Sequence, residues 1–325
     1  MVTDTAKNII KHLEIRKQAT AKELGDFLGI SRQALYKQLG KLLRADKIQK
    51  IGRPPKVFYQ VKIKAEVFTD GEISATDKDV IEKNYLFITP SGQKLQGMEG
   101  FAYWCKKNNL DVVKTAPQYT KTLKKFEVVK TSGLADGTPK IKNTFAQIFL
   151  DKVYYLDFYS IERFGKTKLG QMLLYAKQSQ NKKLMDELIE DIKPKIQEVV
   201  KRFNIDAVGF VPPTVKRELQ FMRELERKLD LKVPVIDIVK IQTPVSVPQK
   251  SLGKLEDRIE NARVTIFVEE SRVFNNILLI DDAIGSGATM NETAKKIREQ
   301  KICNRKLIGL AVTGSFKGFD VISEV

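Results

Sequence analysis

The stretch that most constrains the fold covers residues 277–289 and reads ILLIDDAIGSGAT. Four apolar residues suit a strand that is buried on both faces; two acids end the strand, and a loop of small residues leads into a helical pattern. A strand, a tight loop and a helix N-terminus in this order predict an anion site at the carboxyl edge of an α/β sheet. Strand patterns at 205–211, 233–241 and 307–312, which alternate with helical patterns, predict that this sheet is parallel.

The composition predicts a folded protein with an acidic partner. The chain has 325 residues, of which 42% are hydrophobic, so it can bury a core and divide into two or three domains. A formal charge of +17 favours nucleic acid or phosphate-rich ligands.

Cys105 and Cys303 fit no disulfide framework or zinc knuckle, and His12 is the only histidine, which argues against His-based triads and His-ligated metals, so no metal-ligating residues are predicted. We find no signal peptide or membrane span in the sequence and expect a cytoplasmic protein.

Residues 1–62 have the pattern of a small helical domain with a basic hairpin. A helical pattern at 5–16 precedes a capping-box sequence from Thr20 to Glu23, a turn at 29–31 and a third helix over about 32–46. Strand-like pieces at 47–51 and 56–61 follow. The region holds fourteen Lys or Arg and five Asp or Glu, so it carries +9 of the total charge.

This region, through its sequences AKELG at 21–25 and GISRQAL at 29–35, resembles the winged helix-turn-helix family. The resemblance implies that the third helix enters the major groove of DNA. A winged helix that contacts another protein is the alternative. The side chains expected to contact DNA are Arg32, Gln33, Tyr36, Lys37, Lys41 and Arg53.

Residues 63–149 carry no recognisable chemistry and are expected to form a connecting α+β module. A hairpin is predicted from 85–88 and 94–96, and the aromatic residues at 101–104 are interpreted as core or interface residues rather than as base-stacking groups. From about residue 143 the apolar pattern predicts helices that lead towards Phe164. The Gly- and Lys-containing residues 165–170 are predicted to open a further helix, because they lack the spacing of a P-loop.

The chemistry of residues 277–289 suits a sugar phosphate. Asp281 and Asp282 can accept hydrogen bonds from vicinal ribose hydroxyls, while the loop N–H groups and the hydroxyls of Ser286 and Thr289 can donate to a phosphate. A dinucleotide fingerprint fits less well, because its third glycine would fall at Met290. A capping box of Thr289 with residue 292 needs no ligand, but it leaves the paired acids unexplained.

The segment resembles the phosphoribosyl pyrophosphate motif of type I phosphoribosyltransferases, and the likeness covers about 150–325. Residues 209–217, 249–252 and 258–262 are similar to the ComF-like branch of that family. The resemblance implies an α/β fold with a parallel sheet flanked by helices. It also implies catalytic Asp281 and Asp282 on the ribose, and Mg²⁺ that enters with pyrophosphate. The implied cradle for the 5-phosphate is Gly285, Ser286, Gly287, Ala288 and Thr289, and the candidate pyrophosphate neutralisers are Lys216, Arg217 and Arg258.

The expected organisation is a winged helix-turn-helix domain at 1–62, a connecting module at 63–149 and a phosphoribosyltransferase-like domain at 150–325. This combination resembles purine-repressor-like regulators, which implies a homodimeric DNA-binding regulator that binds phosphoribosyl pyrophosphate or a nucleotide. An active, Mg-dependent phosphoribosyltransferase of nucleotide salvage or DNA uptake, with an attached DNA-binding or interaction domain, stays open. Pro213 lacks an N–H for the pyrophosphate loop, so the sequence decides binding more firmly than catalysis.

Overall fold

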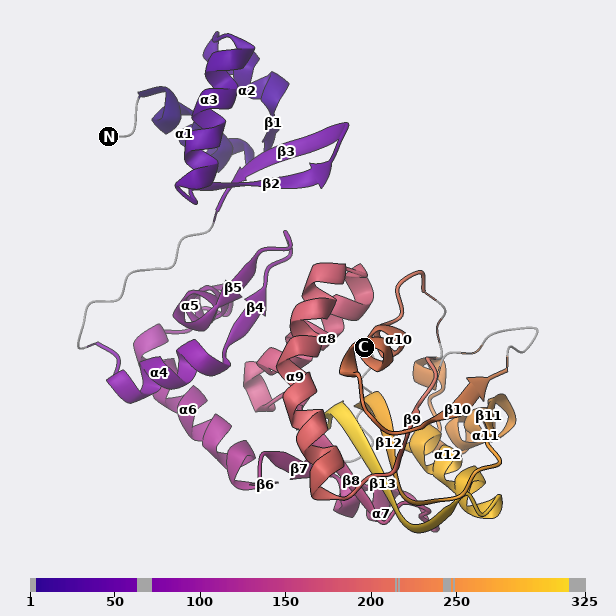
Figure 1. Ribbon diagram of the computed structural model, residues 1–325. Helices are drawn as coiled ribbons and strands as arrows, with labels where there is room; N and C mark the ends of the chain where they lie inside the picture. Colours follow the sequence, from indigo (N-terminus) through magenta and orange to yellow (C-terminus); the bar gives the residue numbers. More distant parts are fainter. Residues whose placement is uncertain are drawn as a thin grey trace. The chain divides into compact units, whose positions relative to one another are not determined.

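The computed structural model describes residues 4–62, 72–213, 215, 217–241, 247 and 249–315. The chain divides into two compact units, one formed by Met1–Val67 with Thr89–Gln93 and the other by Phe68–Ile88 with Lys94–Val325. Figure 1 labels the elements of both units, and we describe each unit by itself.

The smaller unit packs three helices on a small sheet in which the strand order is β1-β3-β2. The capping box predicted at its second helix is confirmed: the N–H of Glu23 donates to Thr20 Oγ1 at 3.2 Å, and the N–H of Thr20 donates to the Glu23 carboxylate at 2.6 Å. Ser31 caps the third helix. The elements are α1 (Asp4–Arg16), β1 (Ala19–Thr20), α2 (Ala21–Leu28), α3 (Arg32–Arg44), β2 (Ile48–Arg53) and β3 (Lys56–Val61).

The larger unit contains an eight-stranded sheet with the order β11-β10-β9-β12-β13-β8-β7-β6. Its central strands β10, β9, β12, β13 and β8 run parallel, and β11, β7 and β6 pair antiparallel at the edges. The predicted parallel sheet is therefore confirmed as a mixed α/β arrangement with a mostly parallel centre. The strands are β6 (Lys130–Thr131), β7 (Leu134–Asp136), β8 (Lys152–Phe158), β9 (Ala207–Phe210), β10 (Val235–Lys240), β11 (Ile266–Glu269), β12 (Phe274–Ile284) and β13 (Cys303–Gly314).

Helices cover both faces of this sheet. Leu278 and Ile280 of β12 pack with α8, α9 and α10, whereas Ile277 and Leu279 pack with α12 on the opposite face. All four side chains have no exposed surface, and burial of each contributes about 1.5–3 kcal/mol. The helices are α7 (Thr138–Thr144), α8 (Lys168–Ser179), α9 (Lys182–Arg202), α10 (Phe221–Leu229), α11 (Leu255–Thr265) and α12 (Ala288–Glu299).

The prediction of helices from residue 143 towards Phe164 is wrong. Helix α7 ends at Thr144, and the aromatic stretch forms strand β8, in which Val153, Tyr155 and Leu156 are buried. Its apolar and aromatic residues fill the centre of a sheet covered on both sides, so they show no clear period of two. Strands β6 and β7 add residues from the expected connecting module to the same sheet.

The remaining elements of the larger unit surround an aromatic cluster. Phe101 is fully buried and contacts Tyr85 and Tyr119, while Trp104 packs partly buried against Phe164. The interpretation as core is confirmed for Phe101 and Trp104, while Tyr103 is partly buried and packs against Phe87. The elements are α4 (Ala75–Asn84), β4 (Leu86–Ile88), β5 (Lys94–Gln96), α5 (Gly97–Lys107) and α6 (Val112–Val128), and the predicted β4–β5 hairpin is present.

Candidate functional site

The topology creates a crevice where β9 and β12 end. These neighbouring strands are parallel, and the Val211 N–H donates to the Ile280 carbonyl at 2.8 Å, so the loop after β9 starts beside the acid pair of β12. The helix after β9 packs on one face of the sheet, and the helix after β12 packs on the other. Two such connections diverge at a topological switch point, where open α/β sheets bind their ligands.

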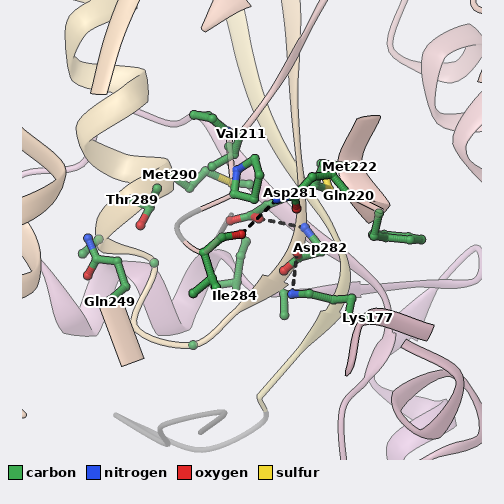
Figure 2. Close-up of a pocket in the computed structure, with 18 of the residues that line it drawn as sticks. Lys177, Val211, Gln220, Met222, Gln249, Asp281, Asp282, Ile284, Thr289 and Met290 are labelled. Carbon is green, nitrogen blue, oxygen red and sulfur yellow. Dashed lines mark hydrogen bonds and ion pairs between the residues drawn. The ribbon is translucent and has the colours of Figure 1, made fainter. Parts of the chain in front are cut away.

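A pocket of about 160 Å³ occupies this crevice. Figure 2 shows Asp281 and Asp282 in the pocket, with Thr289 at the start of α12 and Lys177 reaching in from α8. Of the residues predicted for the ligand, the structure brings these into the lining: Asp281, Asp282, Gly285, Ser286, Gly287, Ala288, Thr289, Arg217 and Arg258. Lys216 lies outside the described residues.

Helix α12 begins without a side-chain cap. Its N-cap is Gly287, which makes no side-chain hydrogen bond, so the alternative of a capping box from Thr289 to Glu292 is wrong. The first N–H groups of a helix have no intrahelical acceptor, and here the Ala288 N–H makes only a long contact with a side chain, at 3.4 Å from Ser286 Oγ. These donors face the pocket together with the positive end of the helix dipole.

Glycine is required at Gly287. Its φ of +87° lies in the left-handed region, and an added Cβ would lie 2.3 Å from Cδ1 of Ile141. The loop can therefore adopt this conformation beside Ile141 only because residue 287 has no side chain.

Two side chains that the sequence analysis missed hold the loop in place. Lys140 Nζ donates to the Gly285 carbonyl at 2.6 Å and also contacts the Ser315 hydroxyl. Asn291 fixes α12 against the segment before β8, because its Oδ1 accepts the Phe149 N–H at 3.1 Å and its Nδ2 donates to the Gln147 carbonyl at 3.0 Å. The partners lie more than 140 residues apart in sequence, so no local sequence pattern predicts these contacts.

The acid pair lies within β12 rather than at its end. The strand continues to Ile284, three residues beyond the predicted end at Asp281, because Asp281 and Ala283 still pair with Ala311 and Thr313 of β13. Asp281 Oδ1 accepts the Asp282 N–H at 2.7 Å, and Asp282 Oδ2 lies 2.6 Å from Lys177 Nζ. Lys177 is a third residue that the sequence analysis missed, since it lies on α8, far from the motif.

The surroundings of the acid pair shift the pKa values of Asp281 and of the nearby Lys240. Burial, and then the neighbouring Asp282, raise the pKa of Asp281. Burial lowers the pKa of Lys240, at the end of β10, and the charge of Asp281 partly offsets this effect. The pocket therefore places a proton-binding carboxylate beside an ion pair.

Arg258 and Arg217, the two described arginines of the predicted set, differ in how deeply they are buried. Arg258 is buried at 5% exposure, its Nε donates to the Leu252 carbonyl at 2.8 Å, and burial lowers its pKa. Arg217 is partly buried in the loop after β9. Gln249 closes the lining nearby and donates to the Arg258 carbonyl at 3.0 Å.

The residues predicted to contact DNA lie on the smaller unit. Leu35, Leu39 and Leu42 turn one side of α3 into the core, which leaves its other side exposed. The predicted residues on that exposed side are Arg32, Gln33, Tyr36, Lys37 and Lys41, and Arg53 ends β2.

Searches for known relatives and related structures give weak likenesses. No protein-family model matches the chain, and no curated protein matches it. A crystal structure of an adenine phosphoribosyltransferase is similar over 42% of this chain and 72% of its own, at 18% identity and a TM-score of 0.27. A hypoxanthine phosphoribosyltransferase from Staphylococcus aureus is similar over 39% of this chain and 72% of its own, at 12% identity and a TM-score of 0.23. These TM-scores are too low to assign a fold, so the α/β architecture rests on the strand order.

The described residues also contain no helix that is both long and apolar enough to cross a membrane. Within the same ranges, no group of three or more His, Cys, Asp or Glu side chains is placed to hold a metal ion.

Proposed function

We propose that the chain is a DNA-binding regulator whose larger unit, with a fold of the type I phosphoribosyltransferase kind, binds phosphoribosyl pyrophosphate or a related nucleotide. The observation that carries this proposal is a single pocket that combines an uncapped helix N-terminus with an acid pair. The two features match the two ends of a ribose 5-phosphate. Backbone N–H groups and a helix dipole bind the phosphate, and carboxylates accept hydrogen bonds from the sugar hydroxyls.

Other residues of the pocket lining suit pyrophosphate that carries a cation. Pro212 and Pro213 have no N–H, so this stretch of the loop after β9 offers carbonyl oxygens, while Arg217 and Arg258 contribute positive charge. Mg²⁺ prefers oxygen donors and is commonly held by substrate phosphates with few protein ligands. When bound, Mg²⁺ would neutralise the pyrophosphate, and the carbonyls of 211–213 are the protein groups that we assign beside it.

The smaller unit supports the DNA-binding half of the proposal. An exposed basic side of α3 and a hairpin of β2 and β3 are the parts that a winged helix uses on DNA, and residues 1–62 carry a formal charge of +9. A homodimer would present two such helices to two half-sites. Binding should fall steeply with salt and weaken when Arg32 and Lys37 are both replaced by alanine, whereas replacement of exposed Lys7 and Lys11 on α1 should have a much smaller effect. A salt-insensitive complex, or equal loss in both variants, would argue for protein contacts instead.

A thermal-shift experiment tests the ligand half. Phosphoribosyl pyrophosphate with Mg²⁺ at about 100 times its Kd should stabilise the protein by about 2.7 kcal/mol and raise Tm. Asp281→Asn with Asp282→Asn should abolish the rise, and Asp237→Asn, an exposed acid on the nearby strand β10, should retain it. No rise in the unmodified protein would refute the proposed ligand.

The same reagents separate a sensor from an enzyme. Loss of pyrophosphate from ribose needs stabilisation of the leaving group, which Mg²⁺ and basic side chains can supply without histidine. Release of pyrophosphate from labelled ligand in the presence of a base would favour the active phosphoribosyltransferase over the regulator.

A further inference from the structure

Lys177 is a buried cation inside the pocket that the sequence motif does not contain. It lies near the end of α8, where its side chain is 10% exposed and its Nζ is 2.6 Å from Asp282 Oδ2, itself 15% exposed. Lysines rarely lose this much contact with water unless they are paired, because burial of a lone ammonium is costly. The ion pair therefore compensates two charges that would each be unfavourable alone.

The pair makes the two acids inequivalent. Leu278 and Ile280 pack on the α8 face, so Asp282, next in the same alternation, faces Lys177 (Figure 2). Asp281 follows Ile277 and Leu279 towards the other face, and the described residues give it no ion pair within 4 Å. Both acids still line the pocket.

A free acid pair would oppose the ligand proposed for this site. Phosphoribosyl pyrophosphate carries several negative charges, and unpaired carboxylates a few ångströms away would repel it in a partly buried site. Neutralisation of one acid by a fixed ammonium removes much of that repulsion. It also leaves the other acid available to accept hydrogen bonds from hydroxyls.

We propose that Lys177 is the resident counter-ion of the site, which neutralises Asp282, assigns the hydroxyl-accepting role to Asp281 and lets the anionic ligand bind without a divalent cation beside Asp282. This inference rests on the proposed function. Lys177 is then a specificity-determining residue for anionic sugar phosphates, and its replacement should change the dependence of binding on Mg²⁺.

The test measures the Kd of phosphoribosyl pyrophosphate on the full chain, by calorimetry, with excess Mg²⁺ and with a chelator. The variants are Lys177→Met, Lys177→Arg, Lys177→Met with Asp282→Asn, and Lys182→Met as a control at an exposed lysine. In the chelator, Lys177→Met should weaken binding about 30-fold or more, as expected for loss of one partner of a buried charge pair. Lys177→Arg should stay within about threefold, and added Mg²⁺ should recover part of the loss.

The double variant separates electrostatics from folding. Removal of the Asp282 charge should restore much of the affinity lost in Lys177→Met, and this variant stays measurable if the single variant fails to fold because of an unpaired buried acid. Unchanged affinity in Lys177→Met, or a folded double variant that binds no better than a folded single variant, would overturn the inference. Absence of binding by the unmodified protein would overturn both the proposed function and this inference. Normal binding by the unmodified protein, with the same Kd in Lys177→Met, would overturn only the inference.

Discussion

Helices α8 and α12 both follow parallel strands of the sheet, but their N-termini are built in opposite ways. In α8, the Thr167 hydroxyl accepts the Gly170 N–H at 3.0 Å and donates to the Phe158 carbonyl at 2.7 Å, so the end is capped and buried. In α12, Gly287 provides no cap and the first turn opens into the pocket. A side-chain cap stabilises the helix but occupies an N–H group that could otherwise bind an anion. Without a cap, the N–H groups at the helix start stay available to an anion.

The difference also separates the contributions of the two helices to the site. Helix α12 offers backbone donors at its start, and α8 offers the Lys177 ammonium near its end. The backbone donors belong to a contiguous loop of the motif. The Lys177 ammonium reaches the pocket only because α8, from an earlier part of the chain, packs on the sheet. The predictions below test this division from the largest expected effect to the smallest.

Gly287→Ala should give the largest loss. The φ of +87° and the contact with Ile141 together should cost about 2–5 kcal/mol of unfolding free energy, and ligand affinity should fall because the loop moves. Chemical denaturation measures the stability. The control is Gly165→Ala before α8, where φ is +75°, ψ is −146° and no atom lies within 4 Å, so its whole cost comes from the backbone and binding should persist. Equal binding losses in both variants would show that α12 has no special role.

Asp281→Asn should change how stability depends on pH. A carboxyl with a raised pKa binds its proton more tightly in the folded state, so its contribution declines as pH rises from about 4 through the raised value. The unmodified protein should lose up to about 1.4 kcal/mol per pH unit from this group in that window, and Asp281→Asn should remove this slope. Unfolding free energies between pH 5 and pH 8 provide the measurement, and identical slopes would contradict the account.

Thr167→Ala and Ser286→Ala should have opposite consequences. Loss of the α8 cap should cost about 1–2 kcal/mol of stability and leave ligand affinity unchanged. Loss of the Ser286 hydroxyl, whose contact with Ala288 N–H is 3.4 Å long, should cost less stability but weaken phosphate binding about tenfold. If Thr167→Ala weakens the ligand more than Ser286→Ala, the comparison of the two helix ends fails.

The sequence predicts those parts of the molecule whose causes are local. The Thr20 cap depends on Glu23, three residues away, and the runs at 277–280 and 285–289 carry the signs of a strand and a tight loop in their own composition. The stretch after residue 143 was misassigned because β8 is covered on both faces, and its pattern then resembles that of a buried helix.

The missed site residues have causes that lie far away in the chain. Lys177 and Lys140 lie 105 and 145 residues before the residues that they contact in the motif, and only the packed sheet brings them there. A lysine in a helix normally indicates a solvated face, so neither residue carries a local signal. The acid pair was predicted, but its division by an ion pair was not.

The central claim is that one pocket holds a phosphoribosyl group through the start of α12 and the acid pair. Calorimetric titration of the full chain with phosphoribosyl pyrophosphate and Mg²⁺ tests it most directly, with ribose 5-phosphate as a competitor. The account predicts one site per chain, competition by ribose 5-phosphate, and loss of binding in Asp281→Asn with Asp282→Asn. Binding that survives in this double variant, or no heat of binding with the unmodified protein, would contradict it.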